Sequence, residues 1–200
     1  MKKLGIMGGT FNPIHLAHIY IAYEAKEVLK LDKVIFLPSG NPPHKKGNKI
    51  IDAKYRYEMV KEAIKGYEGF TIDDYEIKNK GYSYTCDTLM HYKEESVEIY
   101  FITGADSLMD IEKWKNPNVV LSNCIFVTFN RGTYSQEQLI LQKEYLTNKY
   151  NAKIVLLDIV NIDISSTMIR DRIRKMQRVD FFLPTEVLEY IKENNLYEVE

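Results

Sequence analysis

The chain has 200 residues and a formal net charge of −1, with 45% hydrophobic and 28% charged residues. These values are ordinary for a globular domain, and the small net charge excludes a global attraction to nucleic acid or to an anionic membrane surface. No apolar run approaches the ~20 residues of a membrane-spanning helix. The two cysteines, Cys86 and Cys124, have no metal or redox spacing. We therefore expect a cytoplasmic protein forming one domain over residues 1–200, without nucleic-acid or membrane partners.

Short apolar segments alternate with helical patterns along the chain. Strands are predicted at residues 3–7, 34–37, 70–72, 99–103, 125–129 and 154–157. Helices are predicted at residues 15–31, 52–65, 85–94, 107–111, 135–149, 165–176 and 185–194, with Asp52 and Thr85 as N-caps. This alternation predicts an α/β fold, in which a doubly wound parallel sheet has helices on both faces. Residues 165–200 are predicted to form a small C-terminal helical part.

Ligands of open α/β sheets bind at the carboxyl ends of the strands, where the strand order reverses. We therefore expect the loops that follow the predicted strands to carry the chemistry, and they are also the loops richest in unusual residues. They comprise residues 8–18, 38–46, 104–114, 130–132 and 158–170.

The first of these loops predicts a phosphate site. Gly8 and Gly9 lack a Cβ, so the backbone can come close to a ligand, and the helix that follows offers free N–H groups. His15 and His18, three residues apart, lie on one face of the first helical turn. The plainer interpretation is a glycine turn with incidental histidines.

The same stretch, GGTFNPIHLAH over residues 8–18, resembles the GGTFDPIHxGH box of the nucleotidyltransferase superfamily with an HxGH motif. The resemblance implies a Rossmann-like fold and ATP phosphates held by the glycine turn and both histidines, with His18 nearest the α-phosphate. Asn12 replaces the usual Asp and Ala17 the usual Gly, so any role that needs a carboxylate at position 12 is open.

Three further stretches resemble boxes of bacterial nicotinate mononucleotide adenylyltransferases: PSGNPPHK (38–45), SYTCDTL (83–89) and GADSL followed by a tryptophan (104–114). By themselves these stretches are also interpretable as a surface loop, a helix cap and a core tryptophan. The resemblance implies that the indole stacks on the nicotinate ring. It implies that the mononucleotide is bound by Thr10, Asn12, His44, Lys45, Thr85, Trp114 and Arg131.

A last stretch, ISSTMIR (164–170), resembles the ISSTxIR box of the same family. Its small hydroxyl residues open a helix, and Arg170 offers a planar fork that matches phosphate. A well-capped amphipathic helix with surface arginines is the alternative. The resemblance implies that residues 165–200 close the triphosphate site and that His15, His18 and Arg170 are catalytic. It implies that ATP is bound by Gly8, Gly9, Thr10, Phe11, His15, His18, Gly104, Asp106, Ile164, Ser165, Ser166 and Arg170.

The implied reaction joins ATP and nicotinate mononucleotide to give deamido-NAD and pyrophosphate, with Mg²⁺ carried by the phosphates and no protein metal site. The rival enzymes are a nicotinamide mononucleotide adenylyltransferase, a phosphopantetheine adenylyltransferase and a cytidylyltransferase. A binding module that keeps the fold without catalysis would have lost His15, His18 or Arg170, and all three are present. The sequence leaves a homo-oligomer open.

Overall fold

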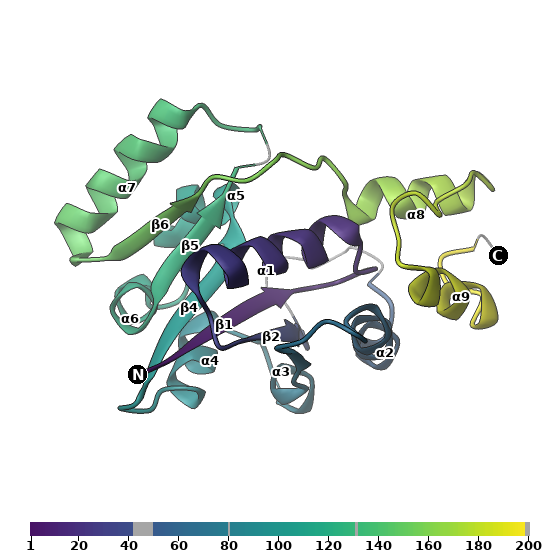
Figure 1. Cartoon of the computed structure of the whole chain (residues 1–200), viewed down its shortest axis with the longest axis horizontal. Coiled ribbons are helices and arrows are strands. Elements are labelled where there is room, and N and C mark those ends of the chain that lie inside the picture. The colour runs from purple at the N-terminus through teal and green to yellow at the C-terminus, as the bar shows by residue number, and fades with distance from the viewer. Residues whose placement is uncertain (42–49, 80, 131, 199–200) are drawn as a thin grey trace.

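A computed structural model describes residues 1–41, 50–79, 81–130 and 132–198 of the chain. One six-stranded sheet forms its centre, with every strand parallel to its neighbours and the strand order β3-β2-β1-β4-β5-β6. The strands are β1 (Lys2–Gly9), β2 (Lys33–Pro38), β3 (Phe70–Ile72), β4 (Val97–Gly104), β5 (Ile125–Phe129) and β6 (Lys153–Leu157). Figure 1 shows helices on both sides of this sheet.

Nine α-helices and one 3₁₀ turn, η2 (Ile111–Lys113), connect and cover the strands in the described residues. The helices are α1 (Leu16–Leu29), α2 (Ala53–Ala63), α3 (Tyr75–Lys78), α4 (Thr85–His91), α5 (Ala105–Asp110), α6 (Pro117–Asn123), α7 (Gln136–Tyr150), α8 (Ser166–Arg174) and α9 (Thr185–Glu193). None of the described helices has the length and apolar character required to cross a membrane.

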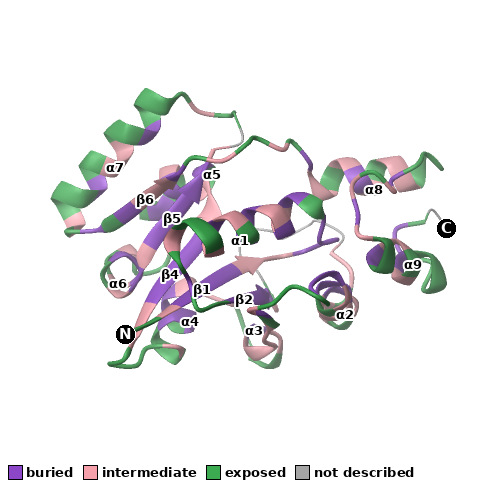
Figure 2. Ribbon diagram, in the orientation of Figure 1, coloured by how far each residue is buried: buried purple, intermediate pink, exposed green. Residues whose placement is uncertain are grey.

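Alternating strand residues divide the core into two layers, one on each face of the sheet. Figure 2 shows that much of the central strands is buried. Met7 and Phe36 belong to the layer under α1, α2 and the C-terminal helices, whereas Ile6 and Leu37 belong to the layer under α4 to α7. Side chains of successive strand residues point to opposite faces, so a strand that is apolar throughout serves both layers. The predicted doubly wound sheet is confirmed.

The order of the strands places the switch point between β1 and β4. The chain moves outward from β1 to β2 and β3, returns to β4 on the other side of β1, and moves outward again to β6. The carboxyl ends of β1 and β4 therefore border a crevice, because the helices that follow these two strands lie on opposite faces.

The six predicted strands and the seven predicted helices are all present, with ends that differ by a few residues. Asp52 is the N-cap of α2, and its carboxylate accepts the backbone N–H of Lys54 at 2.8 Å. The prediction of Thr85 as an N-cap is wrong, because Thr85 is the first residue of α4 and Tyr84 occupies the cap position. The short helices α3 and α6 were not predicted.

Candidate active site

Two cavities open at the carboxyl ends of β1 and β4. The first, called here the Trp114 cavity, has a volume of about 240 Å³ and includes Thr85 and Trp114 in its wall. The second, called the His18 cavity, has a volume of about 320 Å³ and includes His18 and Asp106. Both cavities share five wall residues from the two strand ends: Gly8, Gly9, Thr10, Thr103 and Ser107. The two cavities therefore meet over one glycine turn.

The glycine turn is shaped by the ring of Phe11. A Cβ at Gly9 would lie 2.8 Å from Cζ of Phe11, closer than real contacts allow, whereas one at Gly8 would lie 3.5 Å from the Phe101 ring. Phe11 itself is buried and has a left-handed backbone with φ of 48°. The chain thus reverses directly after β1 over a packed aromatic ring, which only a glycine at position 9 permits.

The two histidines form a stacked pair at the start of α1. Their ring centroids are 3.7 Å apart, and the backbone N–H of His15 donates to Nδ1 of His18 at 3.3 Å. His15 is 1% exposed, so it supports the ring of His18, which is the one in the cavity wall. Because Nδ1 of His18 accepts a hydrogen bond, the proton of the neutral ring lies on Nε2.

Trp114 enters its cavity in an orientation fixed by two aromatic neighbours. Its ring meets Phe101 at 6.3 Å with an interplanar angle of 89°, and it meets Phe126 at 6.3 Å with an angle of 64°. These edge contacts leave the indole half-buried in the cavity wall. Such a ring suits a flat apolar or heteroaromatic group of a ligand.

Two charged side chains also line the Trp114 cavity. Nζ of Lys115 lies 3.2 Å from a carboxylate oxygen of Asp87 and 4.2 Å from the centre of the Tyr84 ring. Glu76 is buried, and its carboxyl accepts the hydroxyl of Thr88 at 2.7 Å. Burial raises the pKa of Glu76, and the Thr88 hydrogen bond opposes this shift. The cavity thus has an exposed cation and a buried carboxyl with raised proton affinity in its wall.

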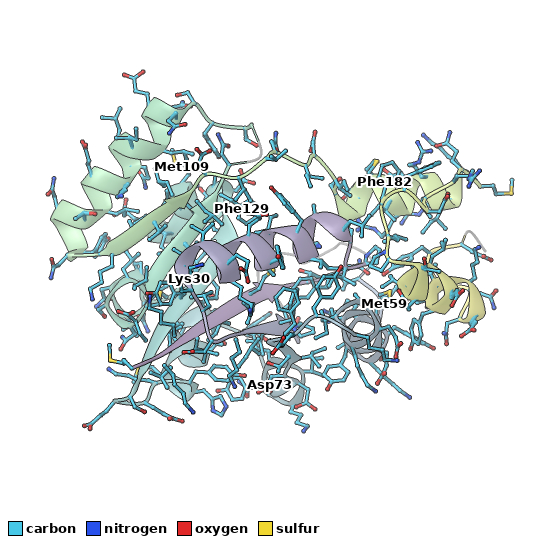
Figure 3. The ribbon with its side chains drawn as sticks, in the orientation of Figure 1. Lys30, Met59, Asp73, Met109, Phe129 and Phe182 are labelled. Atoms are coloured by element: carbon cyan, nitrogen blue, oxygen red, sulfur yellow. The ribbon has the colours of Figure 1, made fainter. Side chains whose placement is uncertain are left out.

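The His18 cavity is lined by the predicted Gly104 and Asp106, which lie where β4 passes into α5. The hydroxyl of Thr103 donates to that of Ser107 at 2.7 Å. This hydrogen bond links the end of β4 to α5, and both residues line both cavities. Phe129, the last residue of β5, also lines the His18 cavity and is labelled in Figure 3. A carboxylate such as Asp106 accepts hydroxyl groups of a sugar well.

The C-terminal helices are bound to the loop after β1. Ser166 donates its hydroxyl to the carbonyl of Pro13 at 2.8 Å, and Nη1 of Arg170 donates to the carbonyl of Asn12 at 2.8 Å. The hydroxyl of Tyr197 donates to the Asn12 side-chain oxygen at 3.0 Å. In Figure 1, α8 and α9 accordingly lie beyond the carboxyl end of β1.

The predicted site residues fall into three groups. Those in a cavity wall are Gly8, Gly9, Thr10, His18, Thr85, Gly104, Asp106 and Trp114. Those in neither wall, but in or against the loop after β1 or at the start of α8, are Phe11, Asn12, His15, Ile164, Ser165, Ser166 and Arg170. His44, Lys45 and Arg131 lie outside the described residues.

Three further side chains bear on the site and were not among the predicted site residues. Glu76 and Lys115 line the Trp114 cavity, and Arg56 is hydrogen-bonded to the backbone of its wall. A signal for Arg56 was available, because it shares the apolar stripe of α2 with Met59, Val60 and Ala63, at the spacing i, i+3, i+4 and i+7. A charged residue within such a stripe is buried and must find partners inside the protein.

The donor set of the site favours anions over cations. Within the described ranges, no group of three or more His, Cys, Asp or Glu side chains is arranged to hold a metal ion. Mg²⁺ prefers oxygen ligands, and among the described residues Asp106 is the one carboxylate in the wall of the His18 cavity. The wall therefore has no carboxylate cluster that would hold the ion by itself, and a Mg²⁺ ion there would be carried by the oxygen atoms of a bound polyphosphate and by water.

A parallel sheet with a glycine turn, a histidine pair and two joined cavities at its switch point is the arrangement of a nucleotidyltransferase. The family model described as cytidylyltransferase-like matches residues 6–172, and the chain belongs to this family.

Within this class the chain belongs to the nicotinate-nucleotide adenylyltransferase family. It is 57% identical over 200 residues to a Clostridium botulinum protein (strain Alaska E43), covering 100% of both chains. It is 54% identical over 199 residues to a Clostridium acetobutylicum protein, covering 98% of this chain and 100% of the relative. Both relatives carry the name "Probable nicotinate-nucleotide adenylyltransferase".

Solved structures agree on the fold. The Plasmodium falciparum nicotinic acid mononucleotide adenylyltransferase complexed with NaAD has a TM-score of 0.81 to this chain, at 20% identity and with 98% of each chain covered. The same enzyme complexed with APC has a TM-score of 0.79, with the same identity and coverage.

Proposed function

We propose that this chain transfers the adenylyl group of ATP to nicotinate mononucleotide, giving deamido-NAD and pyrophosphate in the biosynthesis of NAD. The observation that carries this proposal is the pair of cavities over one glycine turn. ATP binds in the His18 cavity, with its adenosine near Gly104 and Asp106, and the mononucleotide binds in the Trp114 cavity. The names of the relatives support the same reaction.

The nucleophile needs no general base. A phosphate monoester has a second pKa of ~6 and is largely ionised at neutral pH. The barrier comes instead from bringing two polyanions together in line, and positioning supplies roughly 7–11 kcal/mol in well-oriented systems. The shared turn of Gly8, Gly9 and Thr10 lies where the two phosphate groups would meet, so its backbone and hydroxyl groups are placed to hold both.

His18 acts as a hydrogen-bond donor in this proposal. Its Nδ1 is occupied by the His15 N–H, so Nε2 carries the proton that reaches a phosphate oxygen. A donor aimed at charge that develops in the transition state accelerates the reaction more than one that binds substrate alone. His15 contributes by holding the His18 ring in place.

The triphosphate enters as its magnesium complex, so the metal ion is part of the substrate. We propose that residues 165–200 close the triphosphate site, with Arg170 and Ser166 turned to the phosphates when ATP binds. Their attachment to Asn12 and Pro13 supports this placement, because it holds them against the loop that begins at the glycine turn.

Location in the cytoplasm and the absence of nucleic-acid partners stay predictions.

The acceptor is an acid in this proposal, and Lys115 supports that choice over nicotinamide mononucleotide. Its ammonium group lines the cavity that holds Trp114, and it attracts a carboxylate more than a carboxamide. Initial rates of pyrophosphate release with MgATP and each mononucleotide test the assignment. We expect kcat/KM for nicotinate mononucleotide to exceed that for nicotinamide mononucleotide at least tenfold, a free-energy difference of about 1.4 kcal/mol.

A further inference from the structure

Arg56 is a fully buried cation with an unusual set of partners. It is 1% exposed, and its guanidinium donates four hydrogen bonds, all to main-chain carbonyl oxygens. Nη1 donates to Thr10 at 2.7 Å, and Nη2 donates to Ser39 at 2.7 Å and to Gly40 at 3.4 Å. Nε donates to Ile51 at 3.2 Å. Across the described parts of the chain, no carboxylate forms an ion pair with it.

These partners belong to two loops that line the cavities. Thr10 follows β1 and is a wall residue of both cavities, and Ser39 follows β2 and is a wall residue of the Trp114 cavity. On its other side, Gly40 packs closely against the backbone of Glu76: a Cβ at position 40 would lie 2.1 Å from the Glu76 carbonyl oxygen, so only glycine fits there. The hydroxyl of Ser39 is buried and has no hydrogen-bond partner in the described ranges. Arg56 therefore joins the ends of two neighbouring strands from behind the site.

The hydrogen bonds also set the direction of the peptide groups. In a trans peptide the N–H points opposite to the C=O. When the carbonyls of Thr10 and Ser39 turn toward Arg56, the N–H groups of Phe11 and Gly40 turn away from α2. A buried cation behind these planes adds positive potential without occupying the cavities, which favours anionic ligands in front of them.

We infer that Arg56 is a positioning residue for the mononucleotide, holding the loops after β1 and β2 in register so that the wall residues Thr10 and Ser39 keep their places in the Trp114 cavity. This inference rests on the proposed function and adds a residue to it. Lysine cannot replace the arginine fully, because a single ammonium lacks the planar fork that serves several carbonyls at once.

The test compares Arg56→Met and Arg56→Lys with Met59→Ala, a destabilised control from the same buried stripe of α2; Figure 3 labels Met59. Thermal unfolding first establishes that each variant is folded at the assay temperature. We expect kcat/KM for the mononucleotide to fall about 100-fold in Arg56→Met and about tenfold in Arg56→Lys. The KM for ATP should rise in both variants by a smaller factor. Met59→Ala should keep its kcat/KM within about twofold of the wild type. Arginine variants that match Met59→Ala would overturn the inference.

Deuterium exchange gives a second readout that needs no substrate and decides the matter if Arg56→Met fails to fold. In Arg56→Lys we expect faster exchange at residues 8–11 and 36–41 than in Met59→Ala, with β4 unchanged. Uniformly faster exchange would contradict a local role for Arg56. A wild type that is inactive with both mononucleotides would refute the proposed function, whereas the exchange pattern would still decide whether Arg56 holds the loops.

Discussion

His18 illustrates how a few contacts define the role of one side chain. It packs edge-on against Phe11 at 5.1 Å, stacks on His15 and accepts the His15 N–H at Nδ1. The ring is therefore held by Phe11 and His15, and it lies in the wall of the His18 cavity. Such a preorganised donor lowers the barrier because it needs no reorientation during the reaction.

Replacing His18 with alanine should reduce turnover more than stability. We expect kcat to fall about 10²–10³-fold, as for the loss of one preorganised donor, with a small change in the melting temperature. Steady-state kinetics and thermal unfolding measure the two effects. His91→Ala, which removes an exposed histidine stacked on Tyr75, is the matched control and should leave kcat unchanged. Near wild-type turnover in His18→Ala would contradict the assigned role.

The buried Glu76 should make the stability of the folded protein depend on pH. Its pKa is raised by burial, so the folded state holds the proton more tightly than the unfolded state, whose pKa is near the ordinary 4.5. Below that value both states are protonated. As the pH rises from there to the folded-state pKa, the wild type loses stability relative to Glu76→Gln, which stays neutral.

Urea unfolding of both proteins checks this prediction. The free energies of unfolding of Glu76→Gln and wild type should be similar near about pH 4, and the variant should gain relative to wild type by about pH 8. All other titrating groups are common to the two proteins, so the difference isolates Glu76. A difference that stays constant over this range would show that the Glu76 pKa is not raised.

At the scale of elements, the C-terminal part and the loop after β1 form one unit. Ser166 and Arg170 hold the backbone of this loop, and Tyr197 reaches the side chain of Asn12 from 185 residues away. Asn12 is buried, and its amide oxygen accepts from a buried phenol without adding a charge to the interior.

Removing the Tyr197 hydroxyl should destabilise the protein. Tyr197→Phe leaves the buried oxygen of Asn12 without its donor, and we expect a loss of about 1–3 kcal/mol in the free energy of unfolding. Tyr190→Phe serves as control, since among the described residues its ring packs on Tyr55 and its hydroxyl makes no hydrogen bond, and it should change stability by less than about 0.5 kcal/mol. Equal effects of both changes would contradict the coupling.

Regular elements were predictable from local patterns, and the exceptions have physical reasons. Helix α3 has four residues, too few for a periodic pattern. The sequence Asn-Pro-Asn at 116–118 is typical of a turn, but the proline occupies the first turn of α6, where its missing N–H is harmless, and Asn116 takes a left-handed backbone before it. Local signals of this kind fit a turn and a helix start equally well.

The site was predictable only in part. The glycine turn, His18, Gly104, Asp106 and Trp114 lie in loops after strands that the topology brings together, so a list of those loops included them, whereas Thr85 was predicted from the family resemblance alone. Arg56 and Glu76 lie on helices that cover the sheet, and their functional partners are main-chain or remote groups. Only the folded chain brings those partners within reach.

At the scale of the whole molecule, the strand order accounts for the two cavities. Strands β1 and β4 are central neighbours, and the helices that follow them, α1 and α5, cover opposite faces. The walls of the two cavities in the crevice between them include residues from residue 7 to residue 133, and the C-terminal helices are hydrogen-bonded to the loop after β1. In the proposed function, these two cavities hold the two substrates, whose reacting groups would meet over the glycine turn.

The most direct measurement is pyrophosphate release from MgATP in the presence of nicotinate mononucleotide, with nicotinamide mononucleotide, 4′-phosphopantetheine and no acceptor in parallel. The proposed function predicts release that depends on nicotinate mononucleotide, with one deamido-NAD formed for each pyrophosphate and at least tenfold lower kcat/KM for the amide. Absence of turnover with nicotinate mononucleotide, or a preference for any other acceptor, would contradict it.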